Sequence, residues 1–137
     1  MATMELTKIL RFSAAHHLAS PALSPAENRR QYGPCFRGHG HNYALEATVR
    51  GVVGADGMVM DAAVLERAMR TVVDLVDHRD LTREVPALAG TATTGETLAA
   101  AFYGMIERAL PSGRLVRVAV VETENNRFEY EATGEAP

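Results

Sequence analysis

The sequence predicts an α+β fold, in which a four-stranded antiparallel sheet is covered on one face by two helices. Three observations support it. Apolar residues alternate with period two in two segments of the N-terminal half, recur at helical spacing in two central segments, and alternate again near the C-terminus. The expected order of elements is therefore β-β-α-α-β-β.

The two N-terminal segments, 5–12 and 39–50, alternate as half-buried strands do. In the first, Leu6, Leu10 and Phe12 share one face, which continues to His16 if the strand extends. One face of the second segment consists of His39, His41, Tyr43, Leu45, Ala47 and Val49. Both strands thus direct histidines to one side of the sheet.

The helices are expected at 61–76 and 94–110. Asp61 is a good N-cap for the first, whose apolar residues recur every three to four positions. Pro111 and Gly113 end the second. Both helices therefore offer one apolar face to a sheet.

The C-terminal strands are expected at 115–123 and 127–132, joined by a turn at 124–126. Four strands with helices on one face leave both edges of the sheet open. Pairing between subunits would close these edges.

Composition limits the class of protein. The chain has 137 residues, of which 47% are hydrophobic and 23% charged, and we expect a single domain over 1–137. A net charge of −3 gives no general attraction to nucleic acid or to an anionic membrane. One cysteine cannot form an internal disulfide, and neither a signal peptide nor a membrane-spanning run is evident. We expect a cytoplasmic protein.

Three histidines can meet at one place. His39 and His41 project from the same strand face, and His16 ends the neighbouring strand. Three imidazoles and one open position form the usual catalytic zinc site. The alternative is that these are partly buried polar residues in chance alternation. Gly38 and Gly40 favour the metal hypothesis because small residues let other groups approach.

Cys35 lies in the segment 20–38, a Pro-, Ser- and Gly-rich stretch that is expected to be a loop. A lone cysteine is often an inert small hydrophobic residue. Here Arg37 and the expected metal would favour the thiolate, which can act as a general base or nucleophile.

Five more polar residues are candidates. Asp77 and His78 follow the first helix, either as a favourable helix end or as a proton-transfer pair. Glu122 continues a core-facing strand face, so it needs a basic partner or a ligand with two N–H donors, such as a 2-amino-4-oxo pyrimidine ring. Thr94 and Glu96 are explained by helix capping, although free N–H groups there can also bind a ligand.

Together these residues resemble the 6-pyruvoyl/6-carboxytetrahydropterin synthase family. The matching segments occur in the family's order and span residues 12 to 126. They are Phe12-Ser13-Ala14-Ala15-His16-His17-Leu18, Cys35-Phe36-Arg37-Gly38-His39-Gly40-His41-Asn42-Tyr43, Gly57-Met58-Val59-Met60-Asp61, Asp77-His78, Thr94-Gly95-Glu96 and Glu122-Thr123-Glu124-Asn125-Asn126.

The resemblance implies a T-fold, assembled as a homohexamer of two trimers with active sites at subunit interfaces. Each trimer would join its sheets into a barrel. It also implies Zn²⁺ held by His16, His39 and His41, and 7,8-dihydroneopterin triphosphate as the small-molecule substrate.

The resemblance also assigns roles. Cys35 would remove a side-chain proton, His78 would relay protons with support from Asp77, and Glu122 would anchor the pterin ring. Thr94 and Glu96 would lie near the ring. The charge for the triphosphate would come from one or more of Arg29, Arg30, Arg37 and Arg79.

The family divides by product. Three residues separate Cys35 from His39, a spacing that favours the branch making 6-carboxytetrahydropterin and acetaldehyde for queuosine synthesis. The stretches 122–126 and 23–33 look more like the alternative branch, which makes 6-pyruvoyltetrahydropterin by eliminating triphosphate. A third branch carries glutamate where this chain has Gly38 and is set aside. Outside the family, the alternatives are a non-catalytic zinc- and pterin-binding protein and a different zinc enzyme.

Overall fold

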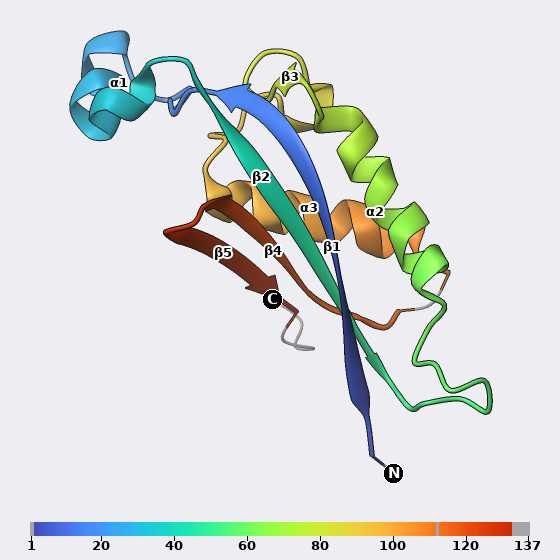
Figure 1. Cartoon of the computed structure of the whole chain (residues 1–137). Coiled ribbons are helices and arrows are strands. Elements are labelled where there is room, and N and C mark those ends of the chain that lie inside the picture. Colours follow the sequence, from blue (N-terminus) through green and yellow to red (C-terminus); the bar gives the residue numbers. More distant parts are fainter. Residues whose placement is uncertain (1, 112, 133–137) are drawn as a thin grey trace.

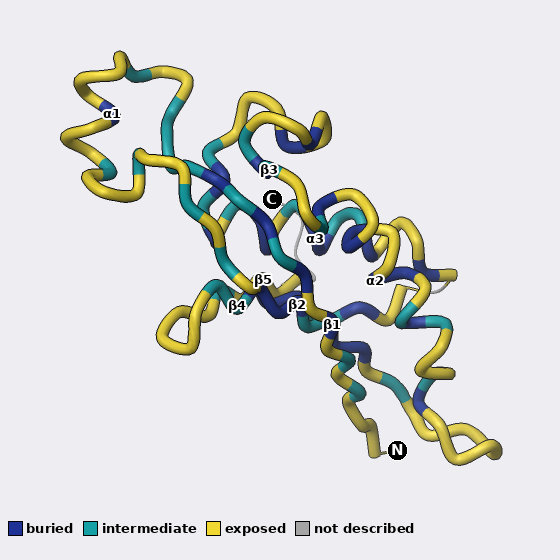
Figure 2. The backbone as a smooth tube through the Cα atoms, turned by 45° about the horizontal axis from the view of Figure 1, so that its top comes forward, coloured by how far each residue is buried: buried dark blue, intermediate teal, exposed yellow. Residues whose placement is uncertain are grey.

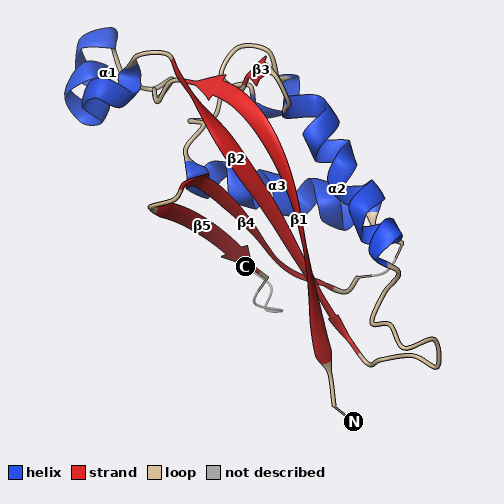
Figure 3. Ribbon diagram, viewed as in Figure 1, coloured by secondary structure: helices blue, strands red, loops and turns tan. Residues whose placement is uncertain are grey.

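A twisted sheet of five strands forms the frame of the protein, and α2 and α3 pack on one of its faces (Figures 1 and 3). This computed structural model describes residues 2–111 and 113–132. The strand order is β3-β1-β2-β4-β5. The strands are β1 (Met4–His16), β2 (His39–Gly51), β3 (Arg79–Asp80), β4 (Leu115–Thr123) and β5 (Asn126–Glu131). The helices are α1 (Pro25–Tyr32), α2 (Ala62–Val76) and α3 (Gly95–Ala109), with short 3₁₀ helices η1 (Gly33–Phe36) and η2 (Pro86–Leu88).

Strands β1 and β2 form a long antiparallel pair that determines where the histidines lie. The register runs from Met4 opposite Gly51 to His16 opposite His39. Alternation therefore puts His16 and His41 on the same face as the core residues of both strands. The predicted meeting of the two strands at their histidine ends is confirmed.

The core lies between the sheet and the two packed helices. Asp61 and Thr94 cap α2 and α3 as predicted, each side chain accepting a hydrogen bond from a backbone N–H in the first turn. Phe12 stacks on Tyr43 with ring centroids 4.8 Å apart, next to Phe102 of α3. None of the described helices is both long and apolar enough to cross a membrane.

The first correction concerns the segment expected to be a loop at 20–38. It contains α1, which begins with a capping box: Ser24 accepts from the Glu27 N–H, and Glu27 accepts from the Ser24 N–H. Pro25 occupies the first helical turn, where its missing N–H is harmless. The Ser24–Glu27 spacing is a sequence signal that composition obscured. The protein thus has three α-helices among its described residues, not two.

The second correction concerns the sheet, which is mixed and not purely antiparallel. Arg79 and Asp80 form the short strand β3, parallel to β1 opposite Ala14 and Ala15. A two-residue strand carries too little pattern to be predicted from periodicity. It nevertheless places the segment after α2 along the histidine end of β1.

The helix-free face of the sheet is charged. Glu5 pairs with Arg50 and Arg117, while Arg127 pairs with Glu46 and with a carboxylate of its own strand. Such a face suits contact with water better than a packed layer.

Candidate metal centre and surrounding groups

Four side chains converge where β1 and β4 end and β2 begins. His16, His39, His41 and Glu122 each offer one ligand atom, and these atoms all lie within 4.8 Å of one another. The three histidines are those predicted from the sequence. Cys35 is not a member of the group. The cluster can hold a metal ion.

Two of the rings are oriented by backbone carbonyls. His16 Nδ1 lies 2.9 Å from the Thr93 carbonyl oxygen, and His39 Nδ1 lies 2.7 Å from that of Arg37. A carbonyl only accepts, so each Nδ1 must carry the proton and donate. This leaves Nε2 of each ring with a lone pair free for a metal, an arrangement typical of metal-binding histidines.

Unsatisfied polar atoms mark the same spot. In the described part of the chain, the buried side-chain atoms without a hydrogen-bond partner are His16 Nε2, His41 Nε2 and Tyr43 Oη. Leaving such an atom unpaired costs about 1–3 kcal/mol. Two of the three atoms belong to the cluster of ligand atoms, and unpaired imidazole nitrogens gathered there suit a metal ion, so the residues present fit one.

Burial sets the protonation of these groups. It lowers the pKa of His16 and His41, so that both are neutral near neutral pH, the form that binds a metal. It raises the pKa of Tyr43 well above its usual value. The phenol therefore stays protonated and can donate a hydrogen bond.

Glu122 is closer to the histidines than the sequence indicated. Its Oε1 lies 3.0 Å from His41 Nε2, without the geometry of a hydrogen bond, and 3.9 Å from His16 Nε2, and its side chain is 17% exposed. The carboxylate can therefore act as a fourth metal ligand or accept N–H groups from a ligand beside the metal. Its predicted role as a ring anchor stays a prediction.

Asp77 and His78 are joined where α2 meets β3. Ser13 donates its N–H to Asp77 Oδ1 at 2.9 Å, and the His78 N–H donates to the Ser13 carbonyl at 2.6 Å. The bond from Ser13 is the main reason why the pKa of Asp77 lies below its usual value. Asp77 Oδ1 also lies 3.0 Å from His78 Nδ1, so it can orient the ring.

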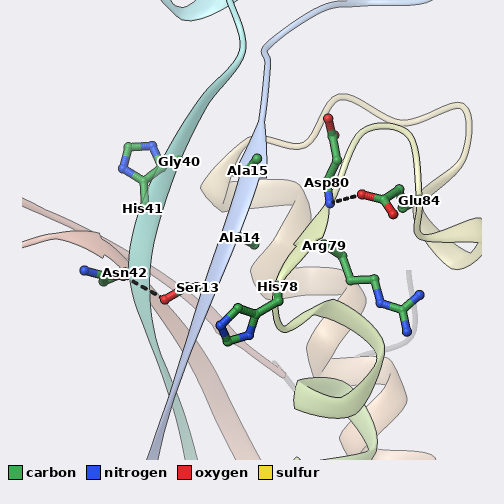
Figure 4. Close-up of a pocket in the computed structure, with 10 residues that line it drawn as sticks. All are labelled: Ser13, Ala14, Ala15, Gly40, His41, Asn42, His78, Arg79, Asp80 and Glu84. Atoms are coloured by element: carbon green, nitrogen blue, oxygen red, sulfur yellow. Dashed lines mark hydrogen bonds between the residues drawn. The ribbon is translucent and has the colours of Figure 1, made fainter.

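His78 has a positive φ of 60°, which is uncommon for a residue with a Cβ. Such backbone strain persists where the surroundings enforce it, often at functional sites. Its exposed ring lines an open cleft of about 490 Å³ together with His41 and Arg79 (Figure 4). The predicted proton-transfer residue and one metal-site histidine therefore border the same cleft.

Cys35 lies elsewhere in the single chain. It is exposed on η1, in a lobe with α1 that projects beyond the sheet (Figures 1 and 2). The lobe is attached by a hydrogen bond from the Leu18 N–H to the Cys35 carbonyl, 2.7 Å long. The structure does not bring Cys35 into the cleft of His78 within one chain.

Thr94 and Glu96 lie at the start of α3, directly after Thr93, whose carbonyl contacts His16. Thr94 is the N-cap, and Glu96 is exposed in the first turn. Between them Gly95 lies directly under the Phe128 ring, with no room for a Cβ. Packing against Phe128 therefore explains the glycine of the Thr-Gly-Glu segment. The ligand role of Thr94 and Glu96 stays a prediction.

Sequence reasoning missed three residues of the site: Tyr43, Thr82 and Thr93. Tyr43 continues the face of His41, which was an available signal, but its alternation with core residues suggested packing only. Thr93 is buried and binds His16 through its backbone carbonyl, a contact independent of residue type. Thr82 contacts the backbone after His16 from a loop that has no motif.

Known proteins resemble the chain over nearly its whole length. The family model described as 6-pyruvoyl tetrahydropterin synthase matches residues 5–133. A 6-pyruvoyl tetrahydrobiopterin synthase of Dictyostelium discoideum is 39% identical over 130 residues, covering 93% of this chain and 96% of that protein. The solved structure of Caenorhabditis elegans 6-pyruvoyl tetrahydropterin synthase has a TM-score of 0.93 at 36% identity, covering 97% of this chain and 98% of that one.

These similarities correct the expected product. A putative 6-carboxy-5,6,7,8-tetrahydropterin synthase of Archaeoglobus fulgidus is 35% identical over only 66 residues, 48% of this chain. The 6-carboxy prediction is therefore wrong, and the pyruvoyl alternative is favoured. The prediction relied on the spacing from Cys35 to His39, which spans the exposed end of the lobe. Spacing there does not determine where the thiol lies relative to the histidines.

Proposed function

Since the chain belongs to the 6-pyruvoyl tetrahydropterin synthase family, we propose that it converts 7,8-dihydroneopterin triphosphate to 6-pyruvoyltetrahydropterin. Membership makes it a lyase that acts on a pterin. In the proposed reaction the carbon–oxygen bond to triphosphate breaks. The side chain is oxidised to the diketone as the ring is reduced to the tetrahydro level, so product and triphosphate together contain the atoms of the substrate. Moving protons is thus the main task of the protein.

The observation that carries the proposal is the cluster of four ligand atoms with unpaired buried nitrogens. We propose Zn²⁺ as its metal, held by His16, His39 and His41, because zinc suits imidazole ligands and leaves one position open. When bound, the metal would polarise a side-chain oxygen of the substrate. Glu122 is proposed to accept the N–H groups of the pterin ring beside the metal.

The proposed proton-transfer residue His78 lines the cleft. His78, oriented by Asp77, can receive and return a proton there. Arg79 lines the same cleft, which makes it our candidate for the triphosphate among the four arginines considered. Thr94 and Glu96 are proposed to lie near the ring.

Cys35 is proposed to reach this cleft from a neighbouring copy of the chain. Its lobe projects into solvent, and both edges of the described sheet are open. Large apolar side chains are exposed on the part of β1 that β3 does not cover, Met4 and Ile9, and on the edge strand β5, Tyr130. Edge pairing would close the sheets of several copies into a barrel, as in the T-fold homohexamer that the family resemblance implies.

The test is to incubate the zinc-loaded protein with the proposed substrate and identify the products by mass spectrometry. Cys35→Ala and Cys35→Ser serve as inactive controls. We expect 6-pyruvoyltetrahydropterin and triphosphate from the wild type, and at least ~100-fold less from either variant.

Two results would count against the proposal. Acetaldehyde with 6-carboxytetrahydropterin would contradict the product. If the substrate binds and is recovered unchanged, the protein is not the proposed enzyme. The alternative of another class, a zinc- and pterin-binding protein without catalysis, would then be favoured.

A further inference from the structure

Two threonines hold the end of β1, where His16 lies. The His17 N–H donates to Thr82 Oγ1 at 3.1 Å, and the same oxygen lies 3.3 Å from the His17 carbonyl. Thr93 Oγ1 lies 3.4 Å from that carbonyl and 3.3 Å from Thr82 Oγ1. Side chains thus satisfy both backbone polar groups of the residue after the metal-site histidine.

This contact begins where the backbone pairing of the sheet stops. The Leu81 N–H donates to the Ala15 carbonyl at 2.8 Å, the last backbone bond between β1 and the segment after β3. One residue later, the Thr82 hydroxyl takes the place of a strand partner for His17. The end of β1 is therefore held on the side opposite β2 by a side chain.

The same unit holds the ring of His16. The carbonyl that accepts from His16 Nδ1 belongs to Thr93, which is 1% exposed and whose hydroxyl meets Thr82. Backbone and ring of His16 are thus fixed by one small hydrogen-bonded group. Nearby groups that orient a histidine usually affect metal affinity strongly.

We propose that Thr82, acting with Thr93, is a positioning residue that holds His16 in the Nδ1–H tautomer with Nε2 facing the cluster. This inference rests on the proposed metal-binding role of the cluster. Thr82 and His78 belong to one segment, which lines the cleft at His78 and contacts the end of β1 at Thr82.

The first measurement is metal affinity, by competition with a chelator for Zn²⁺ and by the visible spectrum of bound Co²⁺. Thr82→Val keeps the shape but removes the hydroxyl, and we expect metal binding ~10–100-fold weaker. Thr82→Ser keeps the hydroxyl and should bind within about threefold of wild type. Thr91→Val is the matched control, since that hydroxyl donates to the Leu88 carbonyl and not to the end of β1.

The second measurement needs no metal. Nitrogen-15 NMR of the metal-free protein reports the tautomer of His16. We expect the Nδ1–H form in the wild type, Thr82→Ser and Thr91→Val, and a mixture of tautomers in Thr82→Val.

The outcomes separate the two proposals. If the wild type binds neither metal, the metal role fails, while NMR still tests the positioning role. Wild-type affinity and tautomer in Thr82→Val would overturn the inference. If Thr82→Val does not fold, Thr93→Val replaces it. That variant keeps the carbonyl but loses the hydroxyl bridge, and wild-type affinity there would equally overturn the inference.

Discussion

The histidine end of the sheet and the projecting lobe differ in how much of their geometry one chain provides. At the sheet end, strand register, burial and backbone carbonyls place the ligand atoms of His16, His39, His41 and Glu122 within 4.8 Å of one another. On the lobe, Cys35 is exposed on a short 3₁₀ turn, away from the cleft of His78. The candidate metal centre is therefore prearranged within a chain, whereas the proposed chemistry needs a second chain.

Mixing two inactive variants gives the largest expected effect and tests this difference directly. Cys35→Ala and His78→Asn should each lose at least ~100-fold in kcat, because each lacks one of the proposed proton-transfer groups. Asparagine is chosen since it tolerates the positive φ of His78. The two variants are unfolded, mixed in equal amounts and refolded together. If Cys35 and His78 of one site come from neighbouring copies, about one quarter of the sites would contain both residues intact.

The measurement is specific activity of the mixture against each variant refolded alone. A mixture as inactive as its components would place both residues in the same chain. The comparison between lobe and sheet end would then lose its functional meaning. Metal content measured in parallel should stay at the wild-type level in all samples.

Glu122→Gln sharpens the description of the sheet end. In the proposed role as a ring anchor, Glu122 would make charge-assisted bonds worth ~1.5–3 kcal/mol, so substrate binding should weaken ~10–100-fold in the variant. Zinc affinity should change by less than about threefold, because the histidines remain. Glu124→Gln, an exposed carboxylate in the β4–β5 turn, is the matched control.

Titration calorimetry with zinc, and then with a non-reacting pterin, separates these roles. If Glu122→Gln loses zinc affinity as strongly as pterin affinity, the carboxylate is a metal ligand. The distance of 3.0 Å to His41 Nε2 would then be the feature that matters.

Much of the sheet end follows from the sequence alone because its signals are periodic. Alternation placed His39 and His41 on one face, and two adjacent strands brought His16 beside them. The lobe has no such period, so α1 was missed despite the Ser24–Glu27 capping signal. Contacts made by the backbone cannot be predicted from residue types. Any residue at position 93 would offer the carbonyl that accepts from His16.

The wrong product prediction has the same origin. Spacing is informative along a strand, where each residue advances the chain by a fixed amount and alternates its side. Between Cys35 and His39 the chain leaves a 3₁₀ turn before it enters β2, so the same count fits many positions of the thiol. Similarity over the whole chain was needed to correct it.

Gly95→Ala tests the packing of β5 against the start of α3. Its expected effect is on stability and is smaller than the effects on activity and binding described above. A Cβ at this position would overlap the Phe128 ring, so the strand or the start of α3 must shift. We expect a loss of about 1–3 kcal/mol in the free energy of unfolding. Gly113→Ala is the control because nothing lies near its Cβ position. Adding Phe128→Leu should recover part of the loss in urea unfolding, and no recovery would assign the loss to α3 alone.

Asp77→Asn should produce the smallest effect, visible in the pH dependence of stability. The Ser13 N–H and His78 lower the pKa of Asp77 in the folded protein below its unfolded value of 3.8. The folded state therefore favours the ionised carboxylate. This contribution is fully present above the unfolded pKa and disappears as pH falls through the lower, folded pKa.

The difference in unfolding free energy between wild type and Asp77→Asn should be constant from neutral pH to about pH 5 and shrink below pH 4. Urea unfolding at several pH values measures it. If the difference persists unchanged in acid, the asparagine side chain destabilises the fold through its shape, and the charge of Asp77 does not stabilise the fold.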